Sequence, residues 1–85
     1  MNIVIVKHEN CGTKYIFLVP ENKILKAGDL VMVESKHGEV IATCLSDSFV
    51  VNEIGAKRVF NAFGIDKPTA YVVGKFTYDK WERIW

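Results

Sequence analysis

Apolar and β-branched residues occur in short runs along the chain, and turn-forming residues separate the runs. Runs of about 4–8 such residues are typical of strands rather than helices. The pattern predicts strands at 2–8, 14–20, 30–35, 40–45, 49–51 and 70–77. Turn formers at Asn10, Gly12 and Gly38 join the first four strands into two antiparallel hairpins. The inward-facing set predicted for the second hairpin is Val31, Val33, Val40, Ala42 and Cys44.

One helix is predicted near residues 53–63, because apolar side chains recur there at the spacing of a single helical face. This stripe consists of Ala56, Val59, Phe60 and Phe63. Gly64 follows at the position of a C-cap, and Ile65 could close the cap with an apolar contact. A second helical segment is predicted in the C-terminal tail. Asp79 and Glu82 have the spacing of a capping box there, and Tyr78, Trp81 and Trp85 share one helical face.

The segment "LKAGDLVMVESKHGEVIATC", residues 25–44, contains a Gly-Asp pair, a Val-x-Val strand, a glycine turn and a return strand. It resembles the hairpin of SH3-like small barrels, of the kind found in KOW-type domains and in the bacterial PSP1 domain. The corresponding residues are Gly28, Asp29 and Gly38. This resemblance, together with the element order, implies a mainly β fold: a small antiparallel SH3-like barrel with one short helix before the last strand and a helical C-terminal tail.

The chain has 85 residues, so we expect residues 1–85 to form a single small β-barrel domain. Apolar residues make up 49% and charged residues 25%, as in ordinary water-soluble domains. The net charge of +1 lacks the basic excess of a dedicated duplex binder. The apolar run before Lys7 is too short for a signal peptide or a membrane span, which predicts a cytoplasmic protein without membrane contact. Free thiols are favoured over a disulfide in that compartment.

Two kinds of site chemistry have candidate residues, and neither is favoured. His8, Cys11, His37 and Cys44 could supply four zinc ligands. An extended strand would, however, place Cys44 roughly 23 Å from His37, which is too far for one ion. His8, Glu9 and Cys11 are close in sequence, but neighbouring residues in a turn do not make a triad. The expectation is a non-enzymatic protein with no catalytic residue, metal or cofactor, in which both histidines are exposed turn residues.

A binding function has two candidate sets of residues. The favoured set is the aromatic C-terminus, Tyr78, Trp81, Ile84 and Trp85. Aromatic side chains anchor many protein interfaces, so this set predicts an interaction or adaptor module that binds a protein partner or itself as a homodimer. Burial of the same residues against the barrel end is the open alternative. The second set predicts a small single-strand RNA- or DNA-binding barrel and consists of Tyr15, Lys57, Arg58 and Lys75.

Overall fold

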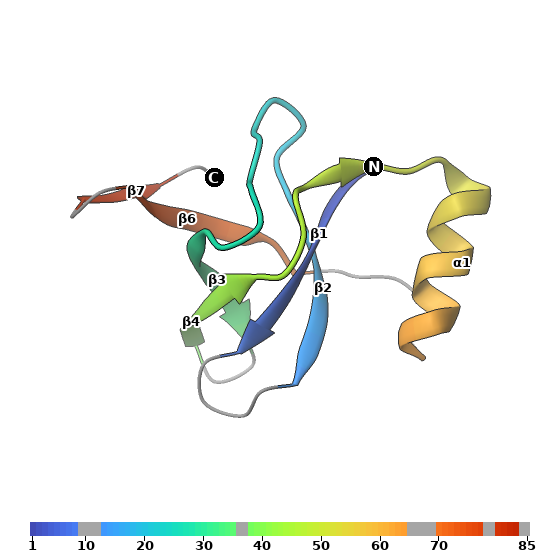
Figure 1. The fold of residues 1–85 in the computed structure, drawn as a ribbon, viewed down its shortest axis with the longest axis horizontal. Coiled ribbons are helices and arrows are strands. Elements are labelled where there is room, and N and C mark those ends of the chain that lie inside the picture. Colours follow the sequence, from blue (N-terminus) through green and yellow to red (C-terminus); the bar gives the residue numbers. More distant parts are fainter. Residues whose placement is uncertain (9–12, 36–37, 65–69, 78–79, 84–85) are drawn as a thin grey trace.

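The strands form one antiparallel sheet that curls around an apolar interior (Figure 1). The computed structural model describes residues 1–8, 13–35, 38–64, 70–77 and 80–83. Its elements are β1 (Asn2–His8), β2 (Lys14–Leu18), β3 (Leu30–Ser35), β4 (Gly38–Cys44), β5 (Phe49–Val50), α1 (Glu53–Phe63), β6 (Val72–Thr77) and β7 (Lys80–Arg83). The strand order is β2-β1-β4-β3-β6-β7, and β5 pairs with β1 beside β4. The predicted mainly β class and both predicted hairpins are confirmed.

The sheet is not closed into a barrel, so that part of the sequence-based expectation is wrong. Leu18 at the end of β2 meets Tyr71, just before β6, in one isolated parallel bridge. The amide of Leu18 donates to the carbonyl of Ala70 over 2.9 Å at the same place. A closed barrel needs a continuous ladder between its first and last strands. Among the described residues, the curling brings β2 and the chain just before β6 together at this one bridge.

The concave face of the sheet holds the larger apolar cluster. Its fully or almost fully buried members are Val4, Val6, Phe17, Val19, Leu25, Val31, Val33, Ala42, Cys44 and Val72. Val40 packs against them and is partly buried, so the inward set predicted for the β3–β4 hairpin is confirmed. Alternate residues of β1 point to opposite faces, and the first part of this strand is buried on both faces because Ile3 belongs to a second cluster on the convex face.

Helix α1 covers the convex face of β1 and β2. Ala56 and Phe60 pack there against Ile3 and Ile16, with Val59 and Phe63 partly buried beside them. The predicted helix is therefore confirmed together with its buried stripe. Asn52 caps its start, since the side chain accepts a hydrogen bond from the Gly55 amide over 2.8 Å. Gly64 ends it in the left-handed conformation, as predicted, whereas Ile65 lies outside the described residues.

Within the described part of the chain, no helix is long and apolar enough to cross a membrane.

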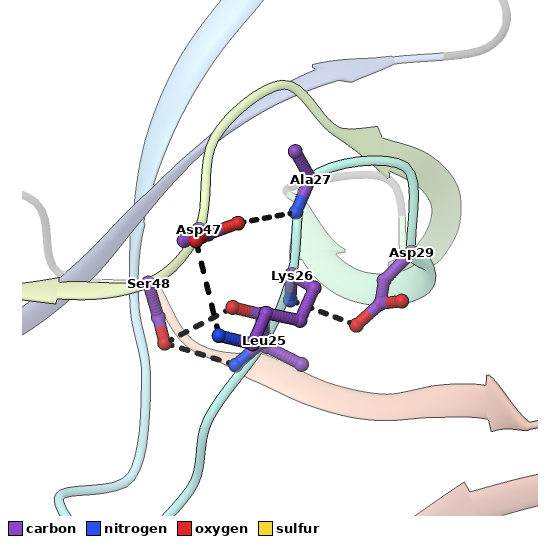
Figure 2. A network of polar contacts seen from close by, with 6 residues as sticks. All are labelled: Leu25, Lys26, Ala27, Asp29, Asp47 and Ser48. Carbon is purple, nitrogen blue, oxygen red and sulfur yellow. Dashed lines mark hydrogen bonds and ion pairs between the residues drawn. The ribbon is translucent and has the colours of Figure 1, made fainter.

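The long connection between β2 and β3 contributes a core residue that the sequence pattern did not single out. Leu25 is fully buried in the concave cluster although its backbone is irregular. Figure 2 shows how Ser48 holds it: the Ser48 hydroxyl accepts from the Leu25 amide over 2.9 Å. The Ser48 amide donates to the Leu25 carbonyl over 2.9 Å as well. The Asp47 carboxylate accepts a hydrogen bond from the Ala27 amide. Residues 47 and 48, just before β5, therefore hold this loop in place.

The Gly-Asp pair that carries the family resemblance forms a tight turn at the start of β3. Gly28 has a φ of +92°, which a residue with a side chain rarely adopts, and its amide donates to the Cys44 carbonyl over 2.8 Å. The Asp29 carboxylate accepts from the Lys26 amide over 2.9 Å and fixes the turn (Figure 2). All these hydrogen bonds are internal to the protein. They give Gly28 and Asp29 a structural role in aligning β3 with β4.

Candidate interaction surface

The described part of the C-terminal tail is a strand and not the predicted helix. Lys80–Arg83 forms β7, which pairs antiparallel with β6 and places Trp81 opposite Phe76. The two rings lie with their centroids 4.8 Å apart. A continuous ladder with β6 satisfies the backbone groups that a short isolated helix would leave unpaired. Tyr78, Ile84 and Trp85 lie outside the described residues, so Trp81 is the member of the favoured set that the structure places.

Gly74 on β6 provides the seat for the Trp81 side chain. A Cβ atom built at Gly74 would overlap the six-membered ring of the indole, so the ring lies directly on the glycine backbone. Glycine within a strand often marks such a close approach. Even so, 39% of Trp81 remains exposed to solvent. The seat therefore fixes the indole on the surface rather than in the core.

Cross-strand pairing places further apolar side chains on the same convex face. Directly opposite residues share a face, and Ile41 pairs with Met32, which pairs with Gly74. Leu30 and Phe76 lie two residues further along their strands, on the same face. Ile41 and Leu30 are 40% and 37% exposed, values that are high for strand residues of this size. We define the outer patch as Leu30, Met32, Ile41, Phe76 and Trp81.

Charged side chains border the outer patch. Arg83, opposite Gly74, forms an ion pair with Glu39 on β4 over 3.7 Å, so its side chain reaches across the convex face. Both partners are exposed, and such a pair contributes at most about 1 kcal/mol. At the β1 side of the patch, Lys7 pairs with Thr43, and Thr43 pairs with Leu30. The Lys7 side chain therefore lies on the same face as Leu30. An apolar centre with a charged rim is the usual organisation of a protein-binding surface.

Helix α1 and the outer patch occupy different parts of the convex face. The helix packs over β1 and β2, and the β6–β7 hairpin lies on the opposite side of the molecule in Figure 1. Among the described elements, none packs on the outer patch. The helix has thus buried one half of this face and left the half centred on Trp81 accessible.

The residues of the nucleic-acid alternative do not form one surface. Lys57 and Arg58 are exposed on α1, which packs on the Ile16 side of β2, whereas the adjacent Tyr15 points to the other face. The parallel bridge between Leu18 and Tyr71 means that β2 and β6 run in the same direction where they meet. Tyr15 comes before this bridge on β2 and Lys75 comes after it on β6, so the two residues lie toward opposite ends of the sheet. The four side chains are divided among three regions.

Of the four candidate zinc ligands, the structure describes His8 and Cys44, and Cys44 is in the core as expected. His8 is half-buried at the end of β1, with its ring 4.3 Å from that of Tyr15 and 6.0 Å from that of Phe17, so the expected exposed turn position is wrong. Cys44 is a buried free thiol in the core, and burial raises its pKa to about 12, with a smaller contribution from the Asp29 carboxylate. Cys11 and His37 lie outside the described residues. A thiol of such high pKa is a poor nucleophile.

The His8 environment predicts a pH-dependent contribution to stability. Burial lowers the pKa of His8, and among the described residues its Nε2 atom has no hydrogen-bond partner. The unfolded chain therefore binds a proton more readily than the folded one. The contribution of neutral His8 is fully present above the unfolded-state pKa of about 6.5 and is lost as the pH falls below it. Urea unfolding at about pH 7.5 and about pH 5.5 should show a larger loss for the wild type than for His8→Phe, which keeps the ring but cannot titrate. Equal losses would refute this assignment.

The described residues offer limited means for small-molecule or metal chemistry. A hollow of about 360 Å³ is open to solvent and is lined by Met1, Val51, Asn52, Glu53 and Ala56. Glu53 is the one titratable side chain in this lining. No group of three His, Cys, Asp or Glu residues within the described ranges is placed to hold a metal ion. The outer patch is accordingly the feature whose chemistry, apolar contact around an aromatic anchor, is best defined.

Comparison of the chain with models of protein families, with curated proteins and with solved structures found no match. The surface must therefore be interpreted from its own geometry. Sequence reasoning found Trp81 but missed Gly74, Leu30, Met32 and Ile41. A glycine inside the predicted strand at 70–77 was the available signal for the seat. The other three residues needed the strand register, which the sequence pattern does not supply.

Proposed function

We propose that this chain is a non-enzymatic protein-interaction module that binds its partner through the outer patch. The observation that carries the proposal is the Trp81 indole, held on Gly74 and 39% exposed within the outer patch. Tryptophan is strongly enriched among residues that dominate binding energy. A ring fixed before binding loses little conformational freedom on association, which favours affinity.

The remaining features of the surface support the same function. Leu30 and Ile41 extend the apolar area on neighbouring strands, and the Glu39–Arg83 pair lies at the rim, where charges influence partner choice more than affinity. The resemblance to SH3-like domains, carried by Gly28, Asp29 and Gly38, is a further part of this proposal. The single-strand nucleic-acid alternative has weaker support, because Tyr15 and Lys75 lie toward opposite ends of the sheet.

Replacement of Trp81 tests the proposal, and Tyr15 supplies a matched control. Both aromatic side chains are 39% exposed, but Tyr15 lies on the other face of the sheet. Tagged wild-type chain should retain a specific protein, and Trp81→Ala should weaken its binding by about 30-fold, the effect of a binding hot spot. Tyr15→Ala should bind as the wild type does. The measurement is quantitative affinity capture, followed by calorimetry with the purified partner.

Two results would contradict the proposal. If Trp81→Ala is folded and retains the partner with wild-type affinity, the outer patch is not the binding surface. If instead the purified chain carries nucleic acid that is released by salt and reduced by Tyr15→Ala, the nucleic-acid function replaces the protein-binding one.

A further inference from the structure

Strand β7 forms a free edge of the sheet. It is the last strand in the order β2-β1-β4-β3-β6-β7, and within the described residues it pairs with β6 alone. All four of its residues, Lys80 to Arg83, are exposed. A free edge presents unpaired amide and carbonyl groups that can pair with another strand. The Trp81 ring does not block this edge, because it is folded back onto Gly74 of the neighbouring strand.

The side chains of β7 are complementary to those of a second, antiparallel β7. Opposite residues in such a pair share a face, and a two-fold axis requires the same contact in both directions. When Trp81 faces Trp81 of the second copy, Lys80 faces Glu82 of the second copy, and Glu82 faces Lys80 of the second copy. Both charge pairs are then attractive, and the two indoles meet near the axis, where aromatic cross-strand pairs are favourable.

The neighbouring symmetric registers are disfavoured by charge. A shift of two residues in one direction brings Glu82 opposite its own copy, and a shift in the other direction brings Lys80 opposite its own copy. Like charges directly opposite each other destabilise a strand pair. Glu82 also lies opposite Lys75 within the same chain. In the favourable register each Glu82 is therefore flanked by Lys75 on one side and by Lys80 of the second copy on the other.

We infer that the chain forms a homodimer in which β7 pairs antiparallel with β7 of a second copy about a two-fold axis at Trp81. This inference rests on the proposed function, since it names a second copy as a partner of the surface around Trp81. The two sheets become continuous across the axis, and the two outer patches adjoin on one face. In the dimer the free edge of each β7, which could otherwise pair with strands of unrelated chains, is covered.

Charge exchange at positions 80 and 82 tests the register directly. Sedimentation equilibrium of the purified wild-type chain should show a dimer. Lys80→Glu and Glu82→Lys each place like charges opposite each other twice, so each should raise the dissociation constant about tenfold or more. The double variant Lys80→Glu/Glu82→Lys should restore dimerisation. An equimolar mixture of the two single variants should form a heterodimer, because both charge pairs between the two chains are then attractive.

Lys57→Glu on the exposed surface of α1 is the control for net charge and should leave the dissociation constant unchanged. A monomeric wild type at a concentration of about 100 µM would overturn the inference, as would a dimer that the single charge changes leave intact. These variants leave every residue of the outer patch in place. If the charge variants at positions 80 and 82 lose dimerisation but still capture another protein, β7 pairing and the proposed function are confirmed separately. If Trp81→Ala loses capture while the dimer stays intact, the result concerns the outer patch alone.

Discussion

Leu25→Ala is expected to lower the free energy of unfolding by about 2–5 kcal/mol, the cost of removing a fully enclosed leucine side chain. Leu25 has no exposed surface and packs in the concave cluster with residues of β1, β3, β4 and β6. Its backbone is held by three hydrogen bonds to Ser48, so the loop cannot readily collapse into the space that the substitution leaves. A large part of the cavity should therefore remain. A domain of this size has a total stability of only about 5–10 kcal/mol, which makes this loss severe.

Ile24 provides the matched control for Leu25. It is the preceding residue of the same loop and has nearly the same size, but 68% of it is exposed. Ile24→Ala should change the unfolding free energy by less than about 0.5 kcal/mol. Urea denaturation followed by circular dichroism measures both variants. Should Leu25→Ala prove too unstable to purify, Leu25→Val gives a smaller loss that can still be measured. Equal effects at positions 24 and 25 would show that the loop is not anchored in the core.

The elements that local pattern could determine were predicted closely. The stripe from Ala56 to Phe63 and the cap at Gly64 define α1, because helix formation depends on neighbours three and four residues apart. The strands β1 and β3 begin and end at the predicted residues. Their β-branched runs and turn residues act over a few positions. Here local preference and tertiary structure agree.

Lys80–Arg83 illustrates where local pattern fails. The spacing of Tyr78, Trp81 and Trp85 fits one helical face, but the same residues also fit a strand in which Trp81 alternates with charged neighbours. Pairing with β6 decides between the two, and this contact depends on residues outside the window that the pattern considers. The open edge between β2 and β6 has the same origin. Whether a curled sheet closes depends on the twist accumulated over all of its strands.

The outer patch required information of both kinds. Trp81 was identified from its residue type alone, because a large aromatic side chain near a chain end needs a partner or a core. Leu30, Met32 and Ile41 were assigned to strands correctly, yet their strands are apolar at nearly every position, so alternation could not show which residues face outward. Only the register that pairs Met32 with both Ile41 and Gly74 brings these residues to Trp81.

Gly74→Ala is expected to displace Trp81 from its seat and to lower the free energy of unfolding by about 1–3 kcal/mol. The added methyl group would overlap the indole ring and would lie 2.8 Å from the carbonyl oxygen of Glu82. The ring alone cannot relieve both contacts, since the second involves the backbone of β7. The β6–β7 hairpin must therefore open, and the outer patch loses its aromatic centre. Partner binding should weaken as it does in Trp81→Ala, even though Trp81 is still present.

Gly55→Ala is the control in which the same chemical change should have the opposite sign. Gly55 lies in α1, its φ is outside the left-handed region, and the nearest atom to an added Cβ is the Asn52 Oδ1 at 3.4 Å. Alanine in a helix is favoured over glycine, so this variant should gain about 0.5–1 kcal/mol. Fluorescence in a Trp85→Phe background reports on Trp81 alone and should shift to longer wavelength in Gly74→Ala only. Wild-type stability and emission in Gly74→Ala would mean that Trp81 is not seated on Gly74, and the indole would then be no fixed anchor for a partner.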